Sequence, residues 1–173
     1  MRRAAVVIGL FLVSCAAACS LRRPAAPASP YCRGDSPLAG VYHPQRLRVK
    51  SRCRVAIGTV RKVKFEAYDG DVHLDLRLDP GYEGLLSAGN GQVGGNLVVE
   101  IIPQDRSRVA VPLEGTRIEV VGPWVDDTQH GWNEIHPAWW VSAGRIEPAS
   151  PTELRKAQLL LQGVEGAAAE NDG

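Results

Sequence analysis

The chain has 173 residues, the length of a single domain, and 45% of them are apolar. Its 18 glycines and 12 prolines favour a turn-rich globular fold over a disordered chain. The full sequence carries 20 basic and 19 acidic residues, which excludes a strongly basic, nucleic-acid-binding class of protein.

The N-terminus has the layout of a secretory signal peptide. Arg2 and Arg3 precede an apolar run over residues 4–13 that is too short to span a membrane. The run ends in "LVSC", which resembles a bacterial lipobox, whose cysteine is acylated and becomes the first mature residue. An ordinary cleavage site within "AAACS" is the alternative. We expect residues 1–14 to be a signal peptide and Cys15 to anchor an exported lipoprotein on the extracytoplasmic side of a membrane.

Residues 15–40 are rich in proline and alanine and lack apolar periodicity, so they are predicted to form a semi-extended tether. The lipobox resemblance implies at least two acyl chains on Cys15, enough for stable anchoring in the lipid bilayer. Removal of residues 1–14 takes away two arginines and leaves 18 basic against 19 acidic residues. The mature protein is therefore nearly neutral, which disfavours nucleic acid as a partner because phosphate binding needs a basic excess.

Two cysteines outside the anchor region are candidates for a disulfide. Cys32 and Cys53 flank the first predicted strand, and an exported protein meets oxidising conditions. A bridge closing this loop would stabilise the fold by about 3 kcal/mol. Two free buried thiols are the alternative.

The stretch "RLRVKSRCR" predicts a half-buried strand with one cationic face, because basic residues alternate with mainly apolar ones. A solvated face is favoured over a site for anions or lipid headgroups. The basic positions are Arg46, Arg48, Lys50, Arg52 and Arg54.

The stretch "VKFEAYDGDVHLDL" predicts a hairpin with a two-residue loop at Asp69-Gly70. That register places apolar residues together on one face and opposite charges together on the other. The expected pairs are Ala67 with Val72, Phe65 with Leu74, Val63 with Leu76, Glu66 with His73, and Lys64 with Asp75. His73 is then a solvent-facing residue rather than a ligand.

Three further strands are expected at "NLVVEIIP", "GTRIEVVGPWV" and "WNEIHPAWWVSAGRI", with a short helix before the first and a bend at Pro137. Five strands with a short helical insert predict a mainly β fold, a small OB-like barrel over residues 41–147, with a β-sandwich as the alternative. Residues 148–173 are expected to form a short helix, with Ser150 as its N-cap, followed by a disordered tail.

The span over residues 41–147, and above all "GPWVDDTQHGWNEIHP", resembles a group of uncharacterised exported bacterial proteins with an OB-like domain. No activity is known for that group. The resemblance therefore implies export and a barrel, and it assigns no functional residue.

The stretch "HGWNEIHPAWW" holds the candidate site residues. On one strand, Trp132, Glu134, His136 and Trp140 should share a face, which makes them candidate ligand-binding residues. With His130 from the preceding turn, Glu134 and His136 could bind zinc, and a metal-dependent hydrolase would follow. Packing of the tryptophans inside the barrel is the alternative to both interpretations.

Motifs for a nucleophilic serine, a phosphate loop and a Cys-x-x-Cys pair are absent from the sequence, so catalysis is the minority interpretation. The leading prediction is a membrane-anchored, non-catalytic barrel that binds an envelope component. A zinc-binding domain is one alternative. Glycan or oligonucleotide binding through the tryptophan-rich face is another, and near-zero net charge favours the glycan. A protein partner from the envelope would also fit.

Overall fold

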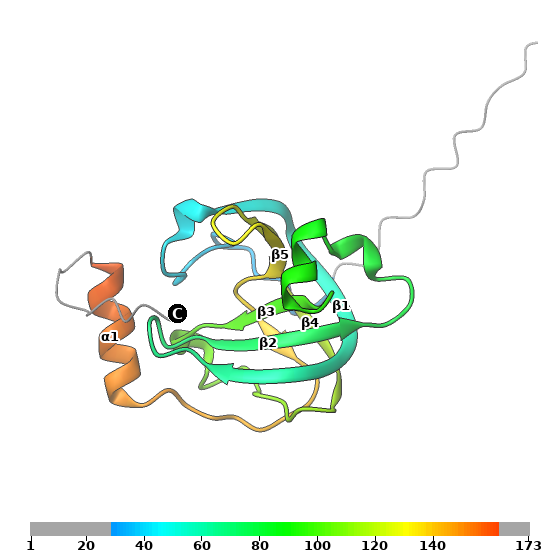
Figure 1. Ribbon diagram of the computed structural model, residues 1–173. Helices are drawn as coiled ribbons and strands as arrows, with labels where there is room; N and C mark the ends of the chain where they lie inside the picture. Colours follow the sequence, from blue (N-terminus) through cyan, green and yellow to red (C-terminus); the bar gives the residue numbers. More distant parts are fainter. Residues whose placement is uncertain (1–28, 163–173) are drawn as a thin grey trace, which may run out of the picture.

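The computed structural model describes residues 29–162 as a mainly β domain with a short helix at its C-terminal side (Figure 1). The predicted signal peptide, Cys15, most of the tether and the tail from residue 163 lie outside the described residues. None of the helices within residues 29–162 is long and apolar enough to cross a membrane.

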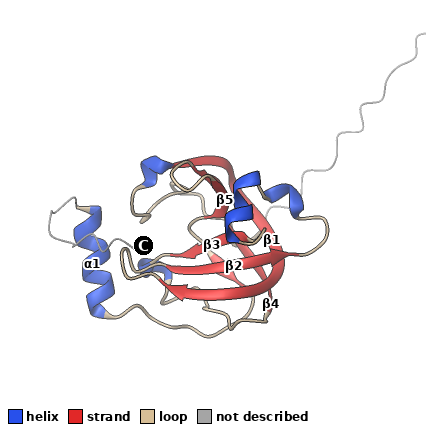
Figure 2. Cartoon of the chain, in the orientation of Figure 1, coloured by secondary structure: helices blue, strands red, loops and turns tan. Residues whose placement is uncertain are grey.

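Six strands form one mixed sheet, drawn in red in Figure 2. They are β1 (Leu47–Phe65), β2 (Val72–Leu78), β3 (Leu97–Ile101), β4 (Arg117–Asp127), β5 (Trp132–Ile135) and β6 (Trp140–Val141). The order β1-β2-β3-β5-β4 closes into a ring because β1 also pairs with β4; only the β3–β5 pair is parallel. The predicted five-stranded, OB-like barrel is confirmed, and the sandwich is not formed.

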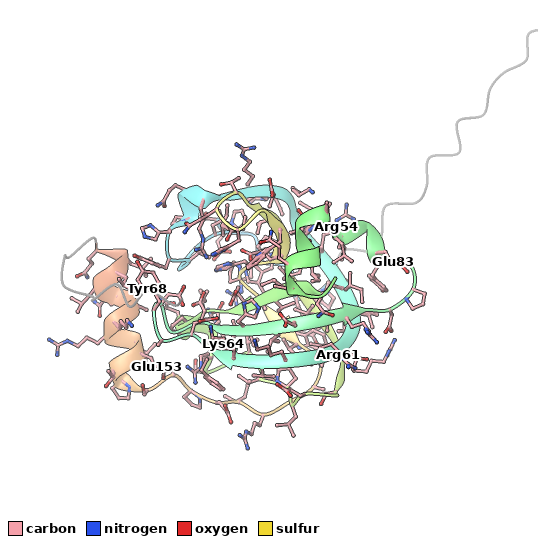
Figure 3. The ribbon with its side chains drawn as sticks, viewed as in Figure 1. Arg54, Arg61, Lys64, Tyr68, Glu83 and Glu153 are labelled. Atoms are coloured by element: carbon pink, nitrogen blue, oxygen red, sulfur yellow. A yellow bond between two sulfur atoms is a disulfide. The ribbon has the colours of Figure 1, made fainter. Side chains whose placement is uncertain are left out.

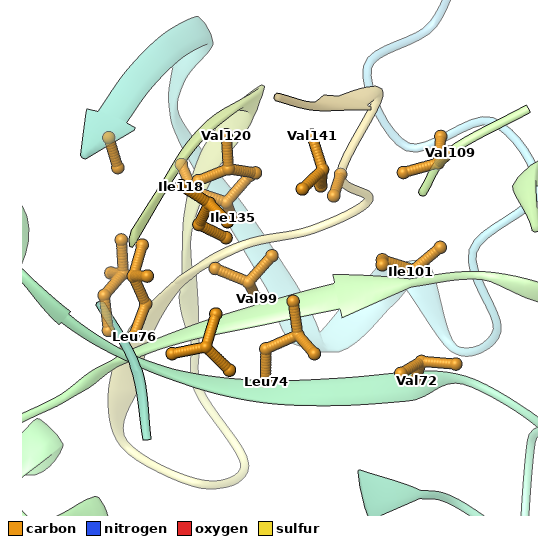
Figure 4. Close-up of a cluster of buried hydrophobic side chains, with 14 of the residues drawn as sticks. Val72, Leu74, Leu76, Val99, Ile101, Val109, Ile118, Val120, Ile135 and Val141 are labelled. Carbon is orange, nitrogen blue, oxygen red and sulfur yellow. The ribbon is translucent and has the colours of Figure 1, made fainter. Parts of the chain in front are cut away.

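The ring encloses the main hydrophobic core. Alternate residues of β2 and β3 point inward, as the period of a strand requires, and they meet apolar side chains of β4 and β5 (Figure 4). The fully buried members labelled there include Val72, Leu74, Leu76, Val99, Ile101, Ile118, Val120 and Ile135.

A second, smaller apolar cluster lies on the outer side of the ring. It consists of Val41, Leu47, Ile102 and Val125. Val125 is the register partner of Glu134, whereas Ile135 belongs to the inner core. Glu134 therefore points outward from the ring, toward the part of the molecule that carries the polar site.

The predicted register of the β1–β2 hairpin is wrong by two residues. Phe65 pairs with Val72, Lys64 with His73, and Lys62 with Asp75. Residues 66–71 form a wider loop, closed by hydrogen bonds from Glu66 N to Asp71 O and from Gly70 N to Glu66 O. A shift of two residues keeps each side chain on its predicted face, so the alternation of the sequence does not distinguish the two registers.

The last predicted strand is two strands. β5 ends at Ile135, the His136–Pro137 peptide is cis, and β6 then pairs with β4 on the far side of the break. The bend predicted at Pro137 is confirmed, but the prediction of a continuous strand past it is wrong.

The cationic face predicted along β1 is only partly regular. Register shifts between Val49 and Ser51 and between Ser51 and Arg54 interrupt the alternation against β4, and Val49 is exposed. Arg46 is half-buried beside Asp127 rather than solvated. Bulges of this kind re-aim side chains, so a period of two in the sequence does not produce one uniform face.

Short helices lie before and between the strands: η1 (Pro44–Arg46), η2 (Glu83–Leu85), η3 (Ala88–Val93) and η4 (Pro103–Asp105), with α1 (Pro151–Leu161) at the end. Ser150 caps α1 in a capping box with Glu153, as predicted. Arg106 binds Glu153 at 2.6 Å and fastens α1 beside the β1–β2 hairpin (Figure 1).

The predicted disulfide joins Cys32 to Cys53. It ties the segment before β1 to the middle of that strand, across a sequence separation of 21 residues. In the loop-entropy description such a link stabilises the fold by about 3 kcal/mol.

Candidate ligand-binding cavity

A polar cavity of about 890 Å³ opens on the outer face of β2 and β3. We call it the polar cavity; its floor is His73, Asp75 and Glu100, and its walls come from the β1–β2 hairpin, η1, η3 and the β4–β5 turn. Lys64 and Tyr68 mark the hairpin wall in Figure 3. The cavity thus combines the β2–β3 face with the two loops that OB-type barrels use to bind their ligands.

His73 occupies the centre of the floor, held between two carboxylates. Its Nδ1 donates to Glu100 Oε1 at 2.8 Å, and its Nε2 donates to Asp75 Oδ1 at 2.9 Å. Burial alone would lower the pKa of His73, but these hydrogen bonds outweigh it and raise the pKa to about 10. The ring is therefore a fixed cation with both nitrogens engaged, which leaves neither for a metal ion or for proton abstraction.

A second, more deeply buried histidine also lies between two carboxylates. The fully buried His136 donates from Nδ1 to Glu134 Oε1 at 2.9 Å, and its Nε2 lies 3.5 Å from Asp71 Oδ2. Burial would lower the pKa of His136, yet the hydrogen bond to Glu134 and the surrounding carboxylates raise it to about 9. Trp132 Nε1 donates to the other oxygen of Glu134 at 3.0 Å and so connects this pair to the cavity wall.

Two residues lining the polar cavity have buried polar atoms without a hydrogen-bond partner. They are the acceptor Glu100 Oε2 and the donor Arg46 Nε; His136 Nε2, which lies deeper, is a third such atom among residues 29–162. The Glu100 side chain is only 10% exposed. Arg46 Nε nevertheless lies 3.3 Å from Asp127 Oδ2 in an ion pair. Buried polar groups are normally paired, so Glu100 Oε2 is the lining atom that needs a hydrogen-bond donor from a ligand.

The β4–β5 turn is built around Asp127. This carboxylate accepts hydrogen bonds from the backbone of Gln129 and His130 and from His130 Nδ1, and Arg46 lies 3.3 Å away. Burial would raise the pKa of Asp127, but the bonds from His130 and the charge of Arg46 hold it below its usual value. The His130 ring consequently stacks on Trp132 with their centroids 4.6 Å apart, which places an aromatic platform at the cavity.

The opposite wall, η3, is locked to this turn. Gly89 fits only because it lacks a side chain, since a Cβ there would lie 1.8 Å from Gly131 O. The buried Asn90 side chain donates to the carbonyls of Asn96 and Asn133 and accepts from Asn133 N. These contacts hold the aromatic platform and η3 in a fixed relation, so the cavity is preorganised rather than formed by a loose loop.

The structure brings together three of the four predicted ligand-binding residues. Trp132, Glu134 and His136 share the outer face as expected. Trp140 does not join them, because it lies on β6, pairs with Val121 and stacks on Tyr31. Because β5 ends at Ile135, Trp140 no longer follows the alternation of that strand.

The predicted zinc ligands are held by other partners. His130 binds Asp127, while His136 binds Glu134 and faces Asp71. Within residues 29–162, no group of three histidine, cysteine, aspartate or glutamate side chains is arranged to hold a metal ion.

Sequence reasoning missed the floor of the polar cavity. Asp71, His73 and Asp75 alternate along "DVHLDL", so they had to share a face, and Glu100 is the single charged residue within the apolar stretch "NLVVEIIP". A lone carboxylate in a fully buried strand was the signal that could have pointed to this site.

No protein-family model matches the chain, and neither a curated protein nor a solved structure shows significant similarity to it.

Proposed function

We propose that this protein is an exported, lipid-anchored domain that binds a glycan of the cell envelope in the polar cavity, without catalysing a reaction. One observation carries the proposal: the cavity is lined by Glu100, whose buried acceptor Oε2 lacks a hydrogen-bond partner. A sugar hydroxyl group can donate to this oxygen and still accept a hydrogen bond from another group in the cavity.

The size and lining of the cavity support a sugar. Its volume of about 890 Å³ falls within the range of small-molecule sites. Trp132, stacked on His130, offers a flat apolar surface beside the polar floor. Sugar rings combine an apolar face with a polar edge, and this wall and floor match both.

Charge balance favours a glycan over an oligonucleotide. The cavity is lined by four basic groups, with the protonated His73 counted among them, and by four carboxylates: Arg46, Lys62, Lys64 and His73 against Glu66, Asp69, Asp75 and Glu100. A site for a phosphate backbone needs an excess of positive charge instead.

The hydrogen bonding of His73 supports binding rather than catalysis. Both nitrogens of His73 are committed to carboxylates, and the residues lining the cavity within the described range 29–162 include no serine, threonine or cysteine. With both nitrogens engaged, His73 is suited to hold the Glu100 side chain in place rather than to take up a proton.

Calorimetric titration of the purified full-length protein with soluble oligosaccharides tests this function. Glu100→Ala removes the unpaired acceptor, so we expect weaker glycan binding by about 1 kcal/mol or more. Glu119→Ala is the matched control, since Glu119 pairs with Ile57 on β1 and does not line the cavity. Equal affinity in both variants, or no binding of any oligosaccharide, would contradict the proposal.

A further inference from the structure

The floor of the polar cavity and the buried His136 cluster next to it together hold more carboxylates than cations. Each of the two imidazoles lies between a pair of carboxylates: His73 between Asp75 and Glu100, and His136 between Glu134 and Asp71. With both rings protonated, full ionisation of the four carboxylates would leave two negative charges uncompensated. A positive donor from a ligand would therefore favour their ionised forms.

The neighbouring basic residues do not make up the difference. Lys64 lies opposite His73 and binds Glu66 at 3.0 Å, while Lys62 lies opposite Asp75 and is exposed to solvent. Arg46 is close enough to favour the charge of Asp71 but is paired with Asp127. The two lysines stand at the rim and Arg46 is committed to Asp127, so the charge deficit is at the bottom of the cavity.

Among these four carboxylates, Glu100 is the one that both lines the cavity and has a buried oxygen without a hydrogen-bond partner. Its Oε1 is satisfied by His73, but Oε2 has no partner, and the side chain is nine-tenths buried. Burial raises the pKa of Glu100, an effect that His73 offsets only in part, and burial likewise raises the pKa of Asp71. Ionised Glu100 thus gains from any positive donor that enters from the cavity.

We propose that the polar cavity selects a glycan with a free primary amine, an amino sugar whose ammonium group donates to Glu100 Oε2 at the cavity floor. This inference rests on the proposed glycan-binding function and names the class of sugar. An ammonium group carries three donors and one positive charge, so it completes the hydrogen bonding of Glu100 and reduces the excess negative charge together. A neutral hydroxyl group supplies only the hydrogen bond, and charge-assisted bonds are about twice as strong.

The inference is tested by calorimetric titration of the full-length protein with glucosamine oligomers and with N-acetylglucosamine oligomers of the same length. Acetylation removes the positive charge and leaves the sugar skeleton intact. We expect the free-amine oligomer to bind at least about tenfold more tightly. Equal affinity for the two oligomers would overturn the amine subsite while leaving glycan binding intact, whereas binding of neither would overturn both proposals.

Two variants test whether the amine of the sugar binds at Glu100. Glu100→Gln keeps the shape of the side chain and removes its charge, and it should abolish the preference for the free amine while retaining the acetylated oligomer. Glu119→Gln is the matched control, because Glu119 pairs with Ile57 on β1 away from the cavity and should leave the preference unchanged. A preference that survives in Glu100→Gln would overturn the assignment.

Titration with spermidine, an amine without a sugar ring, tests whether the sugar contributes to binding. If spermidine binds the wild-type protein as tightly as the glucosamine oligomer, the site binds amines in general and the amino-sugar assignment is wrong. If it binds more weakly than that oligomer, the sugar ring contributes as proposed. Both this comparison and the oligomer comparison use the wild-type protein, so they hold even if Glu100→Gln does not fold.

Discussion

His73 donates to one oxygen of Glu100 at 2.8 Å, while the other oxygen of the same carboxylate is buried without a hydrogen-bond partner. In this pair only one oxygen of the carboxylate is hydrogen-bonded by the protein, and the proposed function depends on the other oxygen. His73 fixes the Glu100 side chain from within the sheet, and the unpaired oxygen remains for a ligand in the polar cavity. The following predictions test the aromatic wall, the charge network, the rigidity of the cavity and the anchor.

The aromatic platform predicts a specific loss of glycan binding. Trp132→Ala should weaken binding by about tenfold or more, because stacking of a ligand ring on an aromatic side chain contributes roughly 1–3 kcal/mol. Tryptophan fluorescence should show saturable quenching in the wild type. Trp140→Ala removes a tryptophan that stacks on Tyr31 outside the cavity and should bind normally. If both variants bind like the wild type, the platform takes no part.

The two buried imidazoles predict that the protein loses stability in alkali. The pKa values of His73 and His136 are raised from 6.5 to about 10 and about 9. Each ring therefore contributes stability that is fully present below pH 6.5 and is lost as the pH rises through the folded pKa. The free energy of unfolding in urea should fall as the pH rises from about 6.5 to about 10.

The raised pKa values of Asp71 and Glu100 act in the same direction from a lower pH, because the folded state holds their protons more tightly than the unfolded state. His73→Gln removes one of the titrating rings, so this variant should show a shallower alkaline slope. An unfolding free energy that is constant or increases across the range would contradict the charge network.

The close contact between η3 and the β4–β5 turn predicts a cost for a single methyl group. Gly89→Ala places a Cβ against Gly131 O, so we expect a loss of about 1–3 kcal/mol in unfolding free energy together with weaker glycan binding. Gly91→Ala, in the same short helix, meets nothing within 4 Å and is the control. If Gly89→Ala were as stable as the wild type, η3 would be able to move away from the β4–β5 turn, and the cavity wall would not be rigid.

The anchor predicted at Cys15 can be tested in a bacterial host. Cys15→Ala should remove the site of acylation, so the protein should leave the membrane fraction or accumulate as an uncleaved precursor. Detergent-phase partitioning and intact mass of the mature protein are the measurements. Partitioning identical to that of the wild type would refute the lipoprotein assignment.

Strand periodicity and turn signals were enough to predict the barrel, its first four strands and the α1 cap, and the export signal was enough to predict the Cys32–Cys53 bridge. They could not fix the hairpin register, because a shift of two residues preserves both faces and the loop is closed by Glu66 and Asp71 through backbone bonds. They also placed Trp140 with Trp132, because the break between β5 and β6 is a tertiary feature.

The site was predicted in part. Trp132, Glu134 and His136 share one strand, so alternation alone placed them together. Glu100 and His73 come from two strands whose pairing had to be known first. The alternation in the sequence indicates which residues face outward. The contact between His73 and Glu100, in contrast, depends on the register between β2 and β3.

A crystal structure of the protein with a bound glucosamine oligomer tests the central claim most directly. The account predicts a sugar ring over Trp132, with its amine within hydrogen-bond distance of Glu100 Oε2. An oligomer bound elsewhere on the surface, with Glu100 Oε2 contacted only by water, would contradict it.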